Sequence, residues 1–245
     1  MRYFCVVSYD GTNYAGWQIQ PNAVSIQQTI EERLSRILNT ETKIYGSGRT
    51  DAKVHALGQT FHFDAKEIDD LDKFRYSFNQ VLPDDIFIKS IIKVTDEFNA
   101  RLSAVSKTYS YVLNNGEMNP FKRNYETFYP KHLDLQKMIE ASKEFIGVHN
   151  FQNFTSKDED ENNYVREIFS IDIKEENHIF TFTFKGDGFM RYMIRFIVGS
   201  LLQVGIDKIS IDDIKASLNS KERHITSFKA EPQGLYLCEV NYAKK

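Results

Sequence analysis

The spacing of apolar residues along the chain predicts strands where they alternate and helices where they recur every three or four positions. In the first part of the chain it gives six elements: strand 3–9, helix 25–38, strand 43–45, strand 57–63, helix 71–82 and strand 86–94. Ser25 and Gln28 have the spacing of a capping box for the first helix, and Pro83 ends the second. The order β-α-β-β-α-β is that of a ferredoxin-like unit.

The rest of the chain repeats this order without evident sequence identity. The same spacing predicts strand 107–113, a helix capped by Asp134 and closed by Gly147, a hairpin of strands 165–173 and 179–184, helix 189–203, helix 211–218 and strand 235–242. We therefore expect an α+β protein of two halves, residues 1–105 and 106–245, with a cleft where their sheets meet. The acidic run Asp158–Glu161 is interpreted as a solvated loop.

Composition places the chain among ordinary globular proteins. Of its 245 residues, 41% are hydrophobic and 27% charged, which excludes wholesale disorder. Cys5 and Cys238 fit no zinc, haem or redox spacing and suit a reducing, cytoplasmic compartment. The N-terminal apolar segment is too short for a signal peptide, and the longest apolar stretch, 196–206, is shorter than the roughly 20 residues that span a bilayer. We expect neither export nor a membrane partner.

Net charge alone argues against a nucleic-acid partner, because 31 basic and 34 acidic residues give −3. The charge is unevenly distributed, however. Residues 185–195 sum to +2, since Lys185, Arg191 and Arg195 stand against Asp187. A near-neutral total can therefore conceal a basic cleft with acidic flanks. Aromatic residues make up 13% of the chain, so a basic groove with stacking rings stays open.

The most unusual stretch is Gly46-Ser47-Gly48-Arg49-Thr50-Asp51. A glycine-rich turn allows close approach of the backbone and here presents an arginine and a carboxylate together. It is not a dinucleotide-binding fingerprint, because Asp51 stands where the third glycine is required, and no Gly-Lys-Ser/Thr follows to make a P-loop. From the residues alone, Asp51 is either half of a structural ion pair with Arg49 or a functional carboxylate.

Six stretches, in order, resemble the tRNA pseudouridine synthase A (TruA) family. The resemblance extends nearly from end to end and rests on YDGTNYAGWQIQPNAVSIQQTIEERL (9–34), GSGRTDAKVHALGQ (46–59), ARLSA with KTYSY (100–111), GVHNF (147–151), FMRYMIR with IVGSL (189–201) and GLYL (234–237). It implies a pseudouridine synthase fold, with two ferredoxin-like halves around a central antiparallel sheet. It further implies a homodimer that binds tRNA across both subunits, with no metal or organic cofactor. The implied reaction is isomerisation of uridine to pseudouridine in the anticodon stem-loop of tRNA, nominally at positions 38, 39 and 40.

The resemblance also assigns roles to individual residues. Asp51 is the catalytic carboxylate, Arg195 its guanidinium partner, and Tyr109 the ring that stacks on the target base. A nearby guanidinium favours the ionised form that a carboxylate needs for such chemistry. Arg49 displaces the target nucleotide, which is inaccessible inside a stem, and Leu235 forms an apolar wall. Without the resemblance, Arg195 would be interpreted as an exposed helix charge and Tyr109 as a core-facing strand residue.

Four further residues are expected to bind substrate or shape the loop. His55 and Gln59 lie in the same motif as Asp51, and Arg191 precedes Arg195 by four positions. Lys53 stands where the family usually has glycine, a residue that tolerates positive φ; the lysine adds a charge for phosphate. His55 and His62 are not expected to bind metal, because no acid or cysteine completes a ligand spacing.

Three alternatives remain open at the level of sequence. The first is that the chain acts on ribosomal RNA or on a narrower set of tRNA sites, as the lysine at position 53 suggests. The second is a non-catalytic RNA-binding protein on the same fold, an interpretation weakened by the lack of an RNP1 pattern. The third is a carboxylate-dependent glycosidase, which would need a second acid near Asp51, where the motif supplies arginine and lysine.

Overall fold

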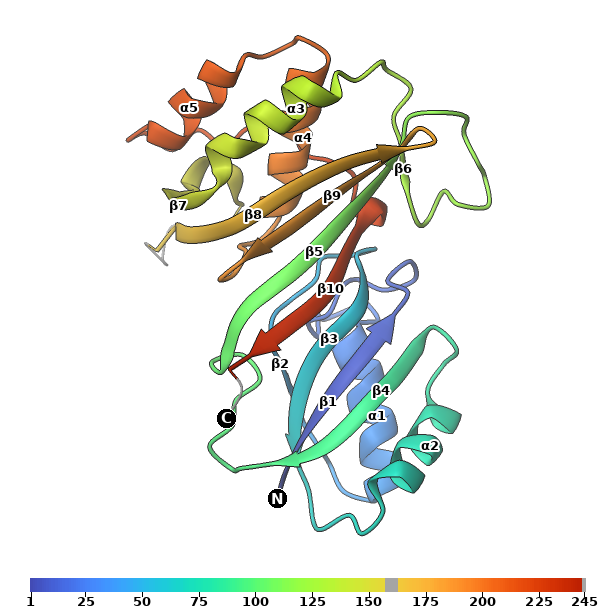
Figure 1. The fold of residues 1–245 in the computed structure, drawn as a ribbon. Coiled ribbons are helices and arrows are strands. Elements are labelled where there is room, and N and C mark those ends of the chain that lie inside the picture. The colour runs from blue at the N-terminus through green and yellow to red at the C-terminus, as the bar shows by residue number, and fades with distance from the viewer. Residues whose placement is uncertain (157–162, 244–245) are drawn as a thin grey trace. The chain divides into compact units, whose positions relative to one another are not determined.

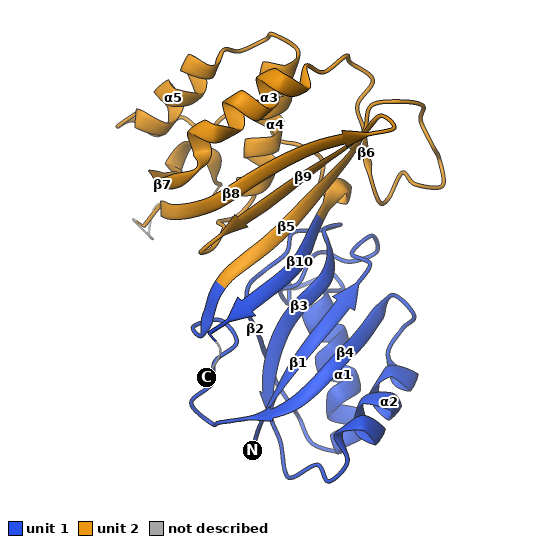
Figure 2. Cartoon of the chain, viewed as in Figure 1, with its two compact units in different colours: residues 1–105, 236–245 blue, residues 106–235 orange. Residues whose placement is uncertain are grey.

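The computed structural model describes residues 1–156 and 163–243, so the acidic run Asp158–Glu161 lies outside the described residues. The chain divides into two compact units (Figures 1 and 2). Unit 1 comprises Met1–Val105 and Tyr236–Lys245, and unit 2 comprises Ser106–Leu235. Residues 236–245 belong to unit 1 and not, as predicted, to the second half. The structure corrects this boundary, because the last strand pairs with a strand of unit 1.

Unit 1 has the predicted order of six elements, followed at the end of the chain by one more strand. The elements are β1 (Arg2–Tyr9), α1 (Ile26–Leu38), β2 (Ile44–Gly46), β3 (His55–Asp64), α2 (Leu71–Val81), β4 (Ile86–Val94) and β10 (Leu235–Tyr242). The strand order is β4-β1-β3-β10, with β2 on β3. β1 runs antiparallel to both neighbours. β10 is parallel to β3, so the antiparallel expectation fails at this pair.

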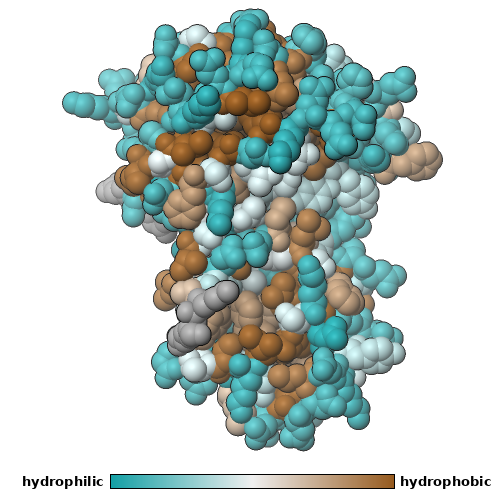
Figure 3. Space-filling view, in the orientation of Figure 1, coloured by the Kyte–Doolittle hydropathy of each residue, from teal (hydrophilic) through white to brown (hydrophobic). Residues whose placement is uncertain are grey.

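One face of the unit 1 sheet makes the core. Side chains of β1 alternate between buried and half-exposed, and Tyr3, Cys5, Val7 and Tyr9 are the buried set. Helices α1 and α2 cover this face (Figure 1). The opposite face leaves Leu57, Phe87 and Ile92 about half exposed, and apolar side chains are visible among polar ones in Figure 3. A covered face and a more open face explain why alternation predicted β1 and β4, whereas β3 is buried on both faces.

Unit 2 contains β5 (Ala104–Asn114, which begins in unit 1), β6 (Thr127–Phe128), α3 (Leu135–Ser142), β7 (Gly147–Asn150), β8 (Val165–Glu176), β9 (Ile179–Gly186), α4 (Met193–Gly205) and α5 (Ile211–Asn219). Its strand order is β5-β9-β8-β7, all antiparallel, with β6 parallel to β5. Short 3₁₀ turns lie at Lys143–Phe145, Gln152–Phe154 and Pro232–Gly234. β6 and β7 were not predicted, since two to four residues are too few to show a period. The α+β class is confirmed.

Backbone conformations explain where the predicted boundaries were wrong. Helix α4 begins at Met193 and not at residue 189, because Tyr192 has φ 62° and cannot continue a right-handed helix. Asn177 and His178 both have positive φ, which fits a two-residue turn and lets β8 and β9 extend beyond the predicted strands. The helix after Asp134 ends at Ser142 and tightens into a 3₁₀ turn.

Helix caps agree with the sequence in part. Ser25 caps α1 as expected, since its hydroxyl accepts a hydrogen bond of 3.2 Å from the backbone N–H of Gln28. The side chain of Gln28 donates instead to Glu32, so it does not complete the predicted capping box. Asp134 caps α3 through the N–H of Lys137.

None of the helices in residues 1–156 and 163–243 combines the length and the apolar character required to cross a bilayer.

The histidine at position 62 makes unit 1 sensitive to acid. Its ring is buried and stacks on Tyr45, and Nδ1 accepts a hydrogen bond of 3.1 Å from the N–H of Ala100. Burial, reinforced by the charge of Arg2, lowers the pKa of His62 below its ordinary value of 6.5. Below about pH 6.5 the unfolded chain therefore binds more protons than the folded chain. The free energy of unfolding decreases as the pH is lowered below that value.

We predict that His62→Gln reduces the loss of unfolding free energy between pH 7 and pH 5, because the titrating group is gone. Urea unfolding at both pH values measures this loss, and the exposed His224→Gln is the control. An identical loss in wild type and His62→Gln would contradict the prediction.

Candidate active site

Residues 46–54, here called the Asp51 loop, connect β2 to β3. Asp51 is half-buried near the end of this loop, and its carbonyl accepts a hydrogen bond of 3.1 Å from the N–H of Val54. At the start of the loop the N–H of Ser47 donates to the carbonyl of Thr60. A Cβ on Gly46 would lie 2.6 Å from Nε1 of Trp17, so only glycine fits there. The loop is therefore packed closely from its first residue.

Gln59 on β3 holds the glycine-rich part of the Asp51 loop. Its side-chain oxygen accepts hydrogen bonds from the Ser47 hydroxyl at 2.7 Å and the Thr60 N–H at 3.0 Å. Its amide donates to the carbonyl of Gly48 at 3.1 Å. The side chain is fully buried, at 0% exposure. Gln59 therefore lies where it can shape the loop. Direct contact with substrate was the other predicted role, and the buried side chain has no exposed surface with which to make it.

Residues 10–17, here called the Gly16 loop, lie against the Asp51 loop. The N–H of Trp17 donates to the carbonyl of Thr50 at 3.0 Å, and the N–H of Lys53 donates to the carbonyl of Tyr14 at 3.3 Å. Gly16 has φ 96°, and a Cβ there would lie 2.6 Å from the Thr50 carbonyl oxygen. Glycine is thus required at this position twice over, for the backbone conformation and for the close approach.

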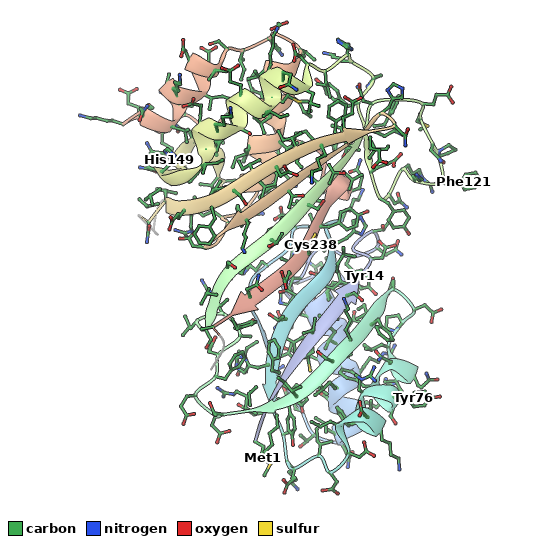
Figure 4. The ribbon with its side chains drawn as sticks, viewed as in Figure 1. Met1, Tyr14, Tyr76, Phe121, His149 and Cys238 are labelled. Carbon is green, nitrogen blue, oxygen red and sulfur yellow. The ribbon has the colours of Figure 1, made fainter. Side chains whose placement is uncertain are left out.

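Two tyrosine hydroxyls fix the Gly16 loop and the Asp51 loop to their surroundings. The hydroxyl of Tyr14, labelled in Figure 4, donates to Oδ1 of Asp85 at 2.6 Å. Tyr9 and Thr50 share a buried hydrogen bond of 2.7 Å between their hydroxyls. Burial raises the pKa of Tyr9, and burial with the Asp85 hydrogen bond raises that of Tyr14, so both hydroxyls stay protonated. These contacts link the Asp51 loop to β1, and the Gly16 loop to the residue before β4.

His55 is another residue of the motif that the structure places in the interior. It is 2% exposed, and its ring stacks on Tyr236 at 4.8 Å. Nδ1 lies 3.1 Å from the N–H of Gly11 and also 3.1 Å from a carboxylate oxygen of Asp10. The Gly11 N–H donates to Nδ1, and the Asp10 carboxylate lies against the same ring nitrogen. His55 therefore fixes the Gly16 loop to β3.

The two cations of the Asp51 loop are exposed. Arg49 and Lys53 lie on either side of Asp51 in the sequence, and both are open to solvent. Lys53 has φ 64°, the left-handed conformation that glycine adopts most readily. Glycine is the residue expected at this position from the family resemblance, and the backbone shows why. The lysine accepts a strained conformation and adds a charge beside the carboxylate.

Arg195, in the first turn of α4, is buried at 7% exposure, so its interpretation as an exposed helix charge is wrong. Its Nε donates to the carbonyl of Ala230 at 2.8 Å, and the N–H of Ala230 donates back to the carbonyl of Arg195 at 2.9 Å. Its guanidinium carbon lies 5.1 Å from the centre of the Tyr192 ring. The side chain is thus held by backbone and ring contacts.

The other predicted residues of unit 2 occupy three different elements. Tyr109 lies on β5 at 8% exposure, with its ring edge-on to Phe189 at 5.3 Å. Leu235 is the first residue of β10 and is buried. Arg191 is exposed in the turn before α4, although it was expected inside a helix over residues 189–203.

Within unit 1 the structure brings Arg49, Asp51, Lys53, His55 and Gln59 to one loop and its supporting strand. Within unit 2 it brings Arg191 and Arg195 to one turn. The structural role of Gly16 was not predicted, although the residue stands in the stretch YAGWQ. In the part of the chain that the structure describes, no three His, Cys, Asp or Glu side chains are grouped to hold a metal ion.

Comparison with known proteins gives consistent relatives over the whole length. The chain is 41% identical over 246 residues to the tRNA pseudouridine synthase A of Streptococcus thermophilus (strain CNRZ 1066), covering 99% of each chain. It is 40% identical over 245 residues to that of Listeria monocytogenes serotype 4b, covering 98% of this chain and 99% of the relative. For the protein of that name from Exiguobacterium sibiricum, the identity is 38% over 241 residues, covering 98% and 96%.

The family model described as tRNA pseudouridine synthase matches residues 5–102 and 141–243, which include the Asp51 loop, the start of α4 and the first residue of β10. A match over most of the chain, with relatives near 40% identity from end to end, shows that this chain belongs to the tRNA pseudouridine synthase family.

Proposed function

We propose that this isomerase converts uridine to pseudouridine in the anticodon stem-loop of tRNA, at positions 38, 39 and 40, with Asp51 as its catalytic carboxylate. The observation behind the proposal is the way the Asp51 loop is held. Backbone hydrogen bonds from the Gly16 loop and the buried amide of Gln59 fix it on two sides, while Asp51 stays half-buried. Family membership supports the reaction class.

The reaction needs one carboxylate at a fixed position. The N1–C1′ bond breaks, a C5–C1′ bond forms, the proton on C5 leaves and N1 gains a proton, so product and substrate are isomers. An ionised Asp51 can attack C6 of the ring or C1′ of the sugar, or can remove a sugar proton to give a glycal. Each route requires the carboxylate to lie within contact distance of the nucleoside. A loop whose backbone is fixed holds the carboxylate in position before substrate arrives.

The remaining residues serve that chemistry. We propose that the exposed Arg49 takes the place of the displaced base, because a paired uridine cannot be reached inside its stem. Tyr109 stacks on the displaced uracil, Leu235 packs against it, and Arg195 supplies the positive charge that keeps Asp51 ionised. Lys53 and Arg191 contact phosphate. His55 and Gln59 act indirectly, through the loops that they support.

We further propose that the enzyme works as a homodimer in the cytoplasm, with one tRNA bound across both subunits. The family resemblance supports the dimer. Sedimentation of the purified chain at micromolar concentration gives twice the monomer mass if the proposal holds, and the monomer mass alone if it fails.

Release of hydrogen from C5 tests the activity directly. A tRNA transcript labelled with tritium at C5 of uridine loses label to water only where C5 forms its new bond. We expect release from anticodon stem-loop uridines, with pseudouridine at those positions by nucleoside mapping. Release from ribosomal RNA and not from tRNA would overturn the proposed substrate, and no release from either would overturn the reaction.

Asp51→Asn keeps the shape of the side chain and removes its charge. We predict that it lowers tritium release at least about a thousandfold, because the reacting group is gone. The free energy of unfolding changes by less than about 2 kcal/mol, since the loop is fixed mainly by its backbone. Asp172→Asn, at an exposed carboxylate of β8, is the matched control and keeps full activity. Unfolding of Asp51→Asn would show Asp51 to be structural.

Gly16→Ala tests whether the Gly16 loop positions Asp51. Its Cβ would clash with the Thr50 carbonyl, so the Asp51 loop must move, and we predict roughly a hundredfold loss of kcat. Gly147→Ala is the control, because Gly147 also has positive φ (103°) but only His149 Nε2, at 3.7 Å, near its Cβ. Both variants lose stability, about 1–3 kcal/mol from backbone strain. Equal kcat values in the two variants would contradict the positioning role.

Two variants of Lys53 separate its charge from its backbone strain. Both Lys53→Gly and Lys53→Ala remove the charge, but only glycine is relaxed at φ 64°. We predict that the unfolding free energy of Lys53→Gly exceeds that of Lys53→Ala by about 1 kcal/mol in urea titrations. Both variants bind tRNA with the same reduced salt dependence. Equal stabilities would mean that the left-handed conformation is not maintained.

A further inference from the structure

Three cations of unit 2 surround a single aromatic ring. The charged groups of Lys229, Arg191 and Arg195 lie 4.6, 4.9 and 5.1 Å from the centre of the Tyr192 ring. A ring has two faces, so at least two of these cations share a face. We call Arg191, Tyr192, Arg195 and Lys229 the Tyr192 cluster. Its inner member, Arg195, is buried, while Arg191 and Lys229 reach solvent.

Local backbone geometry assembles the Tyr192 cluster. Tyr192 is in the left-handed conformation, which turns the chain before α4. The carbonyl of Arg191 accepts hydrogen bonds from the hydroxyl of Thr155 and the N–H of Ser156, which fixes that turn. Lys229 belongs to a segment distant in sequence, residues 228–230, which packs directly on α4. Glycine at position 199 allows this contact, because a Cβ there would lie 2.2 Å from the Phe228 carbonyl oxygen.

Several other lysines of the chain are paired with carboxylates, unlike the exposed cations of the Tyr192 cluster. Lys43, Lys93, Lys137 and Lys215 each lie within 4.0 Å of a carboxylate. For Arg191 and Lys229 there is no such carboxylate in residues 1–156 and 163–243. The Tyr192 ring holds them instead, and its hydroxyl accepts a hydrogen bond of 3.1 Å from Arg191. A ring attracts cations through its face without neutralising them, whereas a carboxylate would compete with an incoming anion.

The position of the cluster makes the excess of positive charge costly. It lies at the first turn of α4, which contains no acidic residue, and the helix dipole disfavours cations there. An anion between Arg191 and Lys229 would relieve both the mutual repulsion of the cations and their repulsion by the helix. Arginine and lysine side chains at the surface of an RNA-modifying enzyme match a phosphate of the RNA backbone.

We propose that Arg191 and Lys229, held on the ring of Tyr192, bind a backbone phosphate of the RNA substrate outside the group that does the chemistry. The inference rests on the proposed function, because it takes RNA as the ligand. Lys229 and Tyr192 are thereby binding and positioning residues, and the site recognises the phosphate without reading the base.

The test measures binding of a fluorescently labelled anticodon stem-loop RNA at several salt concentrations. Each phosphate contact contributes a slope of about 0.7–0.9 to the dependence of log affinity on log salt. We expect Lys229→Gln and Arg191→Gln each to reduce the slope by that amount and the affinity about fivefold at 0.15 M salt. The matched control is Lys208→Gln, whose cation lies 5.2 Å from the Phe228 ring outside the cluster, and it should match wild type.

Variants of the ring separate a positioning role from a charge effect. Tyr192→Phe keeps the ring face and should retain most of the affinity, whereas Tyr192→Leu should behave like the loss of one cation. In steady-state kinetics Lys229→Gln should raise KM about fivefold and leave kcat unchanged, because the phosphate contact is made equally in ground and transition states.

The outcomes separate this inference from the proposed function. If wild type releases tritium from tRNA and Lys229→Gln matches Lys208→Gln in slope and KM, the cluster does not bind RNA and the activity stands. If wild type releases no tritium but binds RNA with a slope that falls in Lys229→Gln and Arg191→Gln, the site stands and the activity fails. A fall in kcat with unchanged salt slope would also overturn the phosphate contact.

Discussion

The close backbone contact between the Gly16 loop and the Asp51 loop is the constraint on which the candidate chemistry depends. Hydrogen bonds from Trp17 to Thr50 and from Lys53 to Tyr14 tie two segments that are more than thirty residues apart. The absence of a side chain at Gly16 allows this approach. On the other side, buried Gln59 fixes Gly48. A carboxylate on an exposed loop would lose its geometry to thermal motion; here the surrounding backbone fixes it before substrate binds.

The two units solve the problem of placing charged groups in different ways. In unit 1 the functional side chains stand on a loop whose supporting residues, His55 and Gln59, are buried. In unit 2 a buried cation, Arg195, is held by the carbonyl of Ala230 and by the Tyr192 ring. Both arrangements restrict the freedom of the side chains before substrate binds.

Much of this organisation can be predicted from the sequence, because burial of one face of a strand or helix produces a periodic pattern of apolar residues. Alternation predicted β1 and β4, and β10 was predicted at its observed bounds. The start of α4 could not be predicted, since the apolar pattern continues through Phe189 and Met190 while the backbone turns at Tyr192. Burial of Arg195 was equally hidden, because its partner is a carbonyl 35 positions away. Lys53 was the informative exception: a lysine at a glycine position signalled the left-handed backbone found there.

Amide hydrogen exchange of the free protein tests the central claim, that the Asp51 loop is fixed before substrate binds. The backbone N–H groups of Trp17, Ser47 and Val54 are all hydrogen-bonded within or onto the loop. The account predicts that they exchange as slowly as amides of β3 and that tRNA slows them little further. Exchange at the rate of an unstructured peptide, with protection only after tRNA is added, would contradict it.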